Sequence, residues 1–168
     1  MTSINLALDL GLVPVPLIGK RVAVTGWQNI AEETTCETLK VNENCDNIGV
    51  VCGKKSGIVV VVIKKKGIKF WDELCNSNTY PKTFIVETGA DGYHYYFKYD
   101  ERIKHISHVP LSVKEKGITV KTDNDQVMFV GSIDHKTMKP YTILYQPDET
   151  IFYPIPDWLL NVLIETSM

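Results

Sequence analysis

Most side chains of this sequence that could bind a ligand are basic, and several of them cluster along the chain. Three lysines directly follow a run of valines, two more precede that run, and a Lys-Arg pair lies near the start. Such clusters suit the phosphate backbone of a nucleic acid, although on a surface they also serve solubility alone. The candidate nucleic-acid-binding residues are Lys20, Arg21, Lys54, Lys55, Lys65 and Lys66. The formal net charge is −2, so the chain as a whole has no electrostatic reason to bind nucleic acid or a membrane.

Carboxylates, which would be needed to hold a divalent cation, are missing beside the valine run. No Asp or Glu occurs between Gly57 and Trp71. Asp123, Asp125 and Asp134 fall in predicted turns, where Asp is common because its side chain hydrogen-bonds the local backbone. The four cysteines form no C-x-x-C pair and have no zinc-type spacing to His, which favours a reduced, intracellular setting. We predict no metal site.

The elements that must position these residues are organised around the stretch from Gly57 to Gly67. Its β-branched run predicts a central strand buried on both faces, because Val and Ile lose side-chain freedom in helices but pack well on a pleated sheet. The exit of such a strand often carries chemistry in α/β folds, so Val62, Ile63 and Lys64 matter most. A one-sided apolar helix is predicted to follow over 68–74.

Further strands and helices are predicted on both sides of this stretch. A Gly-rich turn between strands over 83–87 and 93–99 favours a hairpin, and a second strand pair is predicted around the turn Thr122–Asp125. The other predicted elements are helices over 4–10, 31–39 and 158–164, the last N-capped by Asp157, and strands over 12–17 (at a sheet edge), 22–26, 47–51 and 141–145. With 168 residues, 44% of them apolar, the chain is predicted to form a single α+β domain, residues 1–168, with a mixed sheet.

Three segments in this order take the interpretation beyond a general α+β domain. They are N-I-G-V-V-C-G-K-K-S-G-I-V-V-V-V-I (47–63), E-T-G-A-D-G-Y-H-Y-Y-F-K-Y (87–99) and G-I-T-V-K-T-D-N-D-Q-V-M-F-V-G-S-I-D-H-K-T-M-K-P-Y (117–141). Together they resemble the primase-polymerase (Prim-Pol) domain of the archaeo-eukaryotic primase superfamily, as found at the N-terminus of plasmid and large-DNA-virus primase-helicases. The likeness extends to residues 19–28 and 156–160, and so covers nearly the whole chain.

The resemblance implies a small α/β module packed on an RRM-like sheet unit, with the active site in the cleft between them. In that family three carboxylates hold two Mg²⁺ or Mn²⁺ ions for phosphoryl transfer. The D-x-D pair that ends the central strand falls here on Val62 and Lys64, and the third Asp falls on Thr119. All three catalytic carboxylates are therefore missing from the matching positions.

The family's nucleotide contacts are matched more closely. Its S-x-H motif, which meets the incoming triphosphate, corresponds to Ser132 and His135, with one extra residue between them. Lys121 stands where the family often has a basic residue, and His94 lies on the aromatic strand. We predict these four as nucleotide-binding residues; the alternative is a loop histidine and a histidine packed in a sheet. The tyrosines around His94 could stack on bases or form core.

Taken together, the resemblance and the missing carboxylates predict a replication-related primase-polymerase homologue that is catalytically inactive and retains nucleotide or nucleic-acid binding. DNA, a nucleotide, and a helicase domain or subunit are the implied partners. No cofactor and no membrane are implied, and the expected location is intracellular, in the host cytoplasm or at a viral replication site if the protein is viral. Two alternatives stay open: an active enzyme using displaced acids such as Asp123 or Asp134, and a structural module that binds no nucleic acid.

Overall fold

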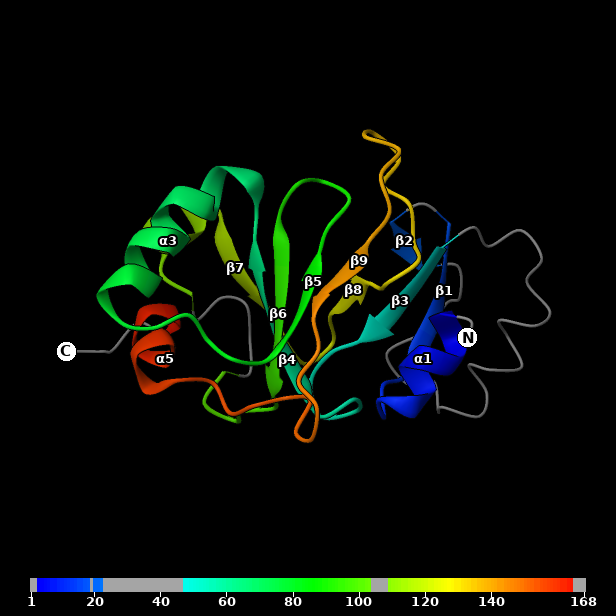
Figure 1. Cartoon of the computed structure of the whole chain (residues 1–168), viewed down its shortest axis with the longest axis horizontal. Coiled ribbons are helices and arrows are strands. Elements are labelled where there is room, and N and C mark those ends of the chain that lie inside the picture. Colours follow the sequence, from blue (N-terminus) through cyan, green and yellow to red (C-terminus); the bar gives the residue numbers. More distant parts are fainter. Residues whose placement is uncertain (1–2, 19, 23–46, 104–108, 165–168) are drawn as a thin grey trace.

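Two β-sheets packed face to face form the centre of the molecule (Figure 1). The computed structural model describes residues 3–18, 20–22, 47–103 and 109–164. The four-stranded sheet has the order β2 (Arg21–Val22), β1 (Pro14–Ile18), β3 (Asn47–Val51) and β8 (Gln126–Met128). The five-stranded sheet has the order β7 (Ile118–Lys121), β4 (Ile58–Ile63), β6 (Tyr93–Lys98), β5 (Phe84–Glu87) and β9 (Thr142–Tyr145).

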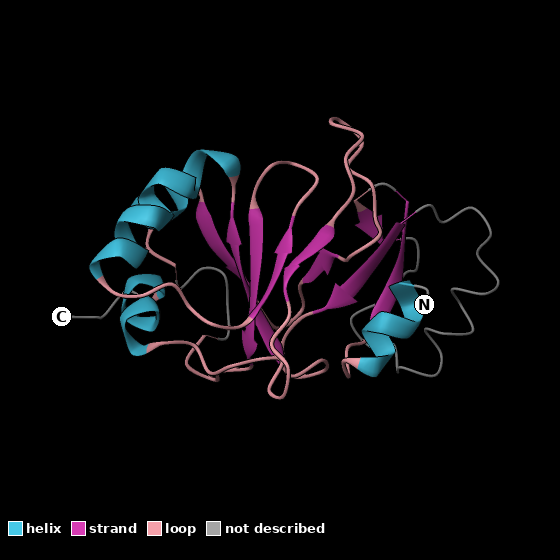
Figure 2. Ribbon diagram, in the orientation of Figure 1, coloured by secondary structure: helices cyan, strands magenta, loops and turns pink. Residues whose placement is uncertain are grey.

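Helices lie on the outer sides of this pair of sheets (Figure 2). α3 (Ile68–Ser77), α4 (Leu111–Glu115) and α5 (Asp157–Leu163) contribute buried residues to a core on one face of the five-stranded sheet, and α1 (Ser3–Asp9) contacts β1 and β3. This arrangement confirms the predicted α+β class. The strand pairs described within both sheets are antiparallel, so two antiparallel sheets stand where one mixed sheet was expected. No helix in the described part of the chain is long and apolar enough to cross a membrane.

β4 is the central element that the valine run predicted. It pairs over its whole length with β6 and over its last four residues with β7. Val59, Val61 and Ile63 point to the core beneath the helices, whereas Ile58 and Val60 point to the core between the sheets. Because successive side chains of a strand alternate between faces, only a run that is apolar throughout can bury both sides.

The core between the sheets takes one apolar face from each of them. Leu17 and Val50 of the four-stranded sheet and Val60 and Tyr96 of the five-stranded sheet are completely buried in it. The core on the other face is centred on Trp71 of α3, whose ring lies 4.8 Å from that of Tyr95. The aromatic strand β6 thus supplies core residues to both sides, as the packing interpretation of its tyrosines predicted.

Two predictions about neighbouring elements are wrong. β7 and β8 do flank the turn Thr122–Asp125, but β7 pairs with β4 and β8 with β3, not with each other. The turn crosses from one sheet to the other, held by a 3.1 Å hydrogen bond from the Thr122 N–H to Asp125 Oδ2. At α5, Asp157 lies inside the first turn and makes no capping hydrogen bond; the N-cap position belongs to Pro156.

Other predicted elements match in part. The proline-containing strand, β1, is paired along one side with β3 and on the other only at Leu17 and Ile18, so it is an edge strand for most of its length in the described structure. The helix α4 was not predicted. The expected helix over 31–39 and the strand over 22–26 beyond its first residue lie outside the described residues, as do Cys36 and Cys45.

Candidate functional site

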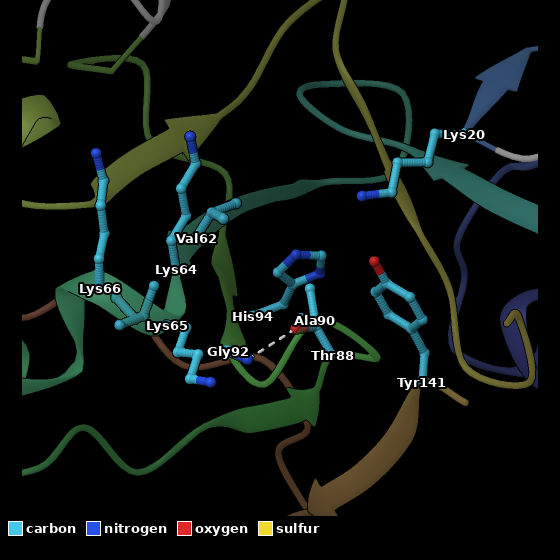
Figure 3. A pocket seen from close by; sticks show the side chains of 11 residues that line it. Lys20, Val62, Lys64, Lys65, Lys66, Thr88, Ala90, Gly92, His94 and Tyr141 are labelled. Atoms are coloured by element: carbon cyan, nitrogen blue, oxygen red, sulfur yellow. Dashed lines mark hydrogen bonds between the residues drawn. The ribbon is translucent and has the colours of Figure 1, made fainter. Parts of the chain in front are cut away.

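A pocket of about 420 Å³ opens between the two sheets at the C-terminal end of β4 (Figure 3). One wall comes from the end of β4 and the turn between β5 and β6, and the opposite wall comes from the β1–β2 turn and the residue before β9. Its lining consists of Lys20, Val62, Ile63, Lys64, Lys65, Lys66, Thr88, Ala90, Gly92, His94 and Tyr141. The volume is in the range of small-molecule sites.

Val62 lies at the middle of the strand ladder that backs this pocket. It pairs with His94 of β6 on one side and with Thr119 of β7 on the other. Directly paired residues present their side chains on the same face of a sheet. Two positions to which the resemblance assigns carboxylates, Val62 and Thr119, are therefore neighbours.

Lys64, at the third such position, continues the strand beyond Val62. Its backbone is extended, with φ −71° and ψ 159°, and its N–H donates to the Gly117 carbonyl at 2.9 Å. Figure 3 shows its side chain rising beside Val62 at the pocket wall. The Lys65–Gly67 segment then turns as a short 3₁₀ helix into α3.

Lysine ammonium groups are the charged groups of the pocket lining. Figure 3 shows Lys64, Lys65 and Lys66 along one side and Lys20 reaching in from the other. The lining residues include no Asp and no Glu. Across the described residues, no group of three or more His, Cys, Asp or Glu side chains is placed to hold a metal ion. The arrangement suits an anion.

The carboxylate of Asp134 is linked to this cationic pocket because it forms an ion pair with Lys20, one of the lining residues. Its Oδ2 lies 3.3 Å from the Lys20 ammonium, and its Oδ1 accepts hydrogen bonds from the N–H groups of Lys136 (2.9 Å) and Thr137 (3.1 Å). Burial alone would raise the pKa of Asp134, but these hydrogen bonds and Lys20 bring it below its ordinary value. The carboxylate therefore stays ionised and offsets part of the charge of Lys20.

Neutral polar groups complete the lining. His94 is 7% exposed, and its Nδ1 has no hydrogen-bond partner. Burial lowers the pKa of His94 to about 3, and the charges of Lys121 and Lys20 act in the same direction, so the imidazole is neutral. Behind the lining, Thr119, which is paired with Val62, also has a buried Oγ1 without a partner. The Tyr141 hydroxyl points into the pocket (Figure 3), and burial, followed by the charge of Asp134, raises its pKa to about 12.

The turn between β5 and β6 forms one edge of the pocket and is tightly fixed. Thr88 Oγ1 accepts a 2.9 Å hydrogen bond from the Gly92 N–H, drawn as the dashed line in Figure 3. A Cβ atom at Gly92 would lie 2.3 Å from the Ile63 carbonyl oxygen. A glycine is therefore required where this turn meets the end of β4.

Ser132 and His135 are not among the residues that line the pocket. Ser132 is fully buried, and its hydroxyl donates to the Ile48 carbonyl at 2.8 Å and accepts from the Ile48 N–H at 3.0 Å. His135 is exposed. In this structure Ser132 joins its loop to β3, and a role for the pair in binding a nucleotide stays a prediction.

The predicted basic residues divide into two groups. Lys20, Lys65 and Lys66 line the pocket together with Lys64. Lys54 and Lys55 lie in the β3–β4 turn, at the other end of a six-residue strand that is roughly 20 Å long. Arg21 lies in β2, and its side chain is outside the described part; Lys121 pairs with Val60 and is half-buried.

Asp123, one of the candidate displaced ligands, also lies away from the pocket. Its Oδ1 accepts from the Lys54 N–H at 3.0 Å, and its Oδ2 accepts from the Tyr99 hydroxyl at 2.7 Å. Both contacts are at the N-terminal end of β4. Asp125 is bound to its own turn through Thr122.

Three contributors to the pocket were not predicted from the sequence. Tyr141 was expected only as the first residue of a strand, and the Thr88–Gly92 turn only as the turn of a hairpin. The pairing of Lys20 with Asp134 joins residues more than a hundred positions apart. This pairing could not be predicted from the sequence without knowing that residues of both sheets contribute to one pocket.

These features define a two-sheet α+β domain with a cationic pocket at the exit of its central strand. A family model described as "Bifunctional DNA primase/polymerase, N-terminal" matches residues 5–158. The chain belongs to this family, which confirms the resemblance to Prim-Pol domains and makes it a DNA primase/polymerase-related domain. A comparison with curated proteins gives no match.

Proposed function

We propose that this domain binds the phosphate groups of a nucleotide or nucleic acid without catalysing nucleotidyl transfer. The observation that carries the proposal is the absence of acidic side chains at the positions to which the resemblance assigns carboxylates: Val62 and Lys64 line the pocket, and Thr119 is paired with Val62 behind it. A side chain that lines the pocket here is either apolar, neutral and polar, or positively charged.

The residues present do not fit the metal ions that the family uses. Mg²⁺ and Mn²⁺ need oxygen ligands, preferably carboxylates. Val62 offers no oxygen and Thr119 only a neutral one. A lysine ammonium about 4 Å from a divalent ion would be repelled by roughly 8 kcal/mol at an effective dielectric constant near 20, which solvent reduces but does not reverse.

The alternative with displaced acidic ligands has less support from the geometry. Asp123 lies at the far end of β4 and is engaged by Lys54 and Tyr99. Asp134 accepts two backbone hydrogen bonds through Oδ1, and its Oδ2, which has no hydrogen-bond partner, is ion-paired with Lys20 at 3.3 Å. One carboxylate that is neutralised by a lysine is a poor site for a divalent cation.

A purely structural role is also less well supported, because the pocket combines several lysines with buried polar atoms that have no partner. A packing surface would gain little from Lys64 and Lys65, which are exposed, or from the unpaired Nδ1 of His94. Intracellular location follows from the cysteine pattern and the family resemblance, and association with a helicase from the resemblance alone; both stay predictions.

Primer synthesis and extension test the proposal directly. The purified chain is incubated with a single-stranded template, with or without a primer, all four dNTPs, and Mg²⁺ or Mn²⁺, next to an active primase-polymerase as positive control. We expect no incorporation. Incorporation that persists through repurification and is lost in Asp134→Asn would instead support the displaced-ligand alternative.

A salt-dependent titration with single-stranded DNA and with dNTPs separates the proposal from the structural alternative. Binding through phosphates weakens as salt rises, because counterions are released when the lysines engage. Absence of binding to either ligand at low salt would support a structural or interaction module.

A further inference from the structure

We propose that the pocket at the end of β4 binds the polyphosphate chain of a nucleoside triphosphate directly through its lysines, with no divalent cation between them, so that Mg²⁺ weakens binding. This inference rests on the proposed function and specifies its ligand. It reverses the usual dependence on metal, since a triphosphate in a carboxylate-lined site is bound together with its cations.

The charge distribution is the first support. Lys64 and Lys65 lie on one wall and Lys20 on the other, so a linear chain of phosphates between the walls can reach cations on both sides (Figure 3). A metal-free triphosphate carries about four negative charges at neutral pH, and a bound Mg²⁺ cancels two of them. A site made of lysines therefore prefers the metal-free form, and Lys64 repels the metal itself.

Unsatisfied polar groups are the second, independent support. His94 is more than nine-tenths buried, lines the pocket, and has an Nδ1 without a hydrogen-bond partner. Thr119 lies on the other side of β4, paired with Val62 and outside the pocket lining, and its Oγ1 is likewise buried without a partner. Buried polar groups without partners are rare, since each costs free energy. A phosphate oxygen in the pocket could accept a hydrogen bond from a neutral imidazole N–H.

Pocket size decides between a free nucleotide and a longer strand as the source of the phosphates. About 420 Å³ accommodates a small molecule and not a duplex. The cations that would continue a track for a backbone, Lys54 and Lys55, lie at the opposite end of β4. A nucleoside triphosphate is therefore the ligand class that the geometry favours.

The Lys20–Asp134 ion pair should weaken triphosphate binding, and removing it should therefore strengthen that binding. The Asp134 carboxylate competes with the ligand for the Lys20 ammonium. Asp134→Asn removes the competing charge but keeps an oxygen for the hydrogen bonds from the Lys136 and Thr137 N–H groups. We expect it to tighten triphosphate binding about twofold to fivefold, the range of a partly exposed ion pair.

The experiment is a calorimetric titration of the full chain with dATP, inorganic tripolyphosphate, deoxyadenosine, and a 5′-phosphorylated oligonucleotide, each in EDTA and in excess Mg²⁺ at equal ionic strength. We expect dATP and tripolyphosphate to bind about tenfold more tightly in EDTA, and deoxyadenosine not to bind. Lys64→Gln and Lys65→Gln should each weaken dATP binding about tenfold. Lys98→Gln, an exposed lysine at the far end of β6, is the matched control and should leave it unchanged.

Each other outcome overturns the inference in an identifiable way. Tighter dATP binding in Mg²⁺ than in EDTA would overturn it and leave the proposed function standing. Salt-dependent binding of the oligonucleotide without binding of dATP would also overturn it in favour of a strand end, again with the proposed function intact. No binding of any phosphate-containing ligand by a correctly folded chain would overturn both.

Discussion

Replacing Val62, Lys64 and Thr119 together by Asp should convert the cationic pocket into a site for a divalent cation. Val62 and Thr119 are directly paired across β4 and β7, so their Cβ atoms are about 5 Å apart and two carboxylates there can share one ion. Position 64 lies two residues further along the strand, about 7 Å away on the same face. Three carboxylates then surround one point.

The size of the effect follows from the change in charge. Lys64→Asp alone replaces a repulsion of roughly 8 kcal/mol with an attraction of similar size, for an ion about 4 Å away at an effective dielectric constant near 20. Solvent screening reduces both figures, but the sign changes. If free Mn²⁺ is supplied at about a hundred times its dissociation constant, binding should raise the free energy of unfolding by about 2.7 kcal/mol. For a chain of this length that corresponds to roughly 5–10 °C in melting temperature.

Calorimetry with Mn²⁺ and thermal melts with and without the metal measure this effect. The matched control replaces the same three residues by Asn, which has the size of Asp without its charge. The Asp variant should melt below the parent chain without metal, because three like charges repel each other, and recover with Mn²⁺. If it folds cooperatively but binds Mn²⁺ no better than the Asn control, the assignment of the three positions to a lost metal site is refuted.

Three further predictions concern individual residues. The pKa of His94 is about 3 in the fold, so between pH 3 and about pH 6.5 the imidazole is protonated in the unfolded chain and neutral in the folded one. The free energy of unfolding, measured in urea melts, should therefore fall by about 2 kcal/mol from pH 7 to pH 5. His94→Gln should remove this part of the pH dependence. Ser132→Ala should lower the free energy of unfolding by about 1–3 kcal/mol in urea melts, because the Ile48 N–H and carbonyl lose their partner; an unchanged value would show that these hydrogen bonds contribute nothing to stability. Gly92→Ala should lower the melting temperature by several degrees and weaken dATP binding, since its Cβ would collide with the Ile63 carbonyl; unchanged melting would show that the turn can move.

The parts of the fold that were predictable have strong local signals. The valine run specified β4 because a strand buried on both faces must be apolar throughout. The β5–β6 hairpin was predicted from its Gly-rich turn. The pairing of β7 and β8 was mispredicted because a polar turn between two short strands looks the same whether the chain returns in one sheet or crosses to another. Which of the two occurs depends on how the sheets pack against each other, and no local sequence pattern indicates that packing.

The site was predictable to a smaller extent for a related reason. Lys64, Lys65 and Lys66 were recognisable as candidates because they stand together at the exit of the central strand. The opposite wall of the pocket is formed by Lys20 and Tyr141, which are brought close to these lysines only by the packing of the two sheets. Motif spacing also drew attention to Ser132, whose hydroxyl bonds to Ile48, a residue 84 positions away. A hydroxyl that serves a distant backbone looks the same in sequence as one that serves a ligand.

The elements that form this pocket are held together without the carboxylates that the family resemblance implies at positions 62, 64 and 119. β4 is held by its ladders to β6 and β7 and by an apolar core on each face. Carboxylates at positions 62 and 119 would stand about 5 Å apart and repel each other in the absence of metal, so a valine and a threonine there favour the folded state. Because Lys64 and Lys65 are exposed, their charges add little strain to the fold. If the proposed function is right, a few side chains at the exit of one strand decide whether this fold binds cations or anions there.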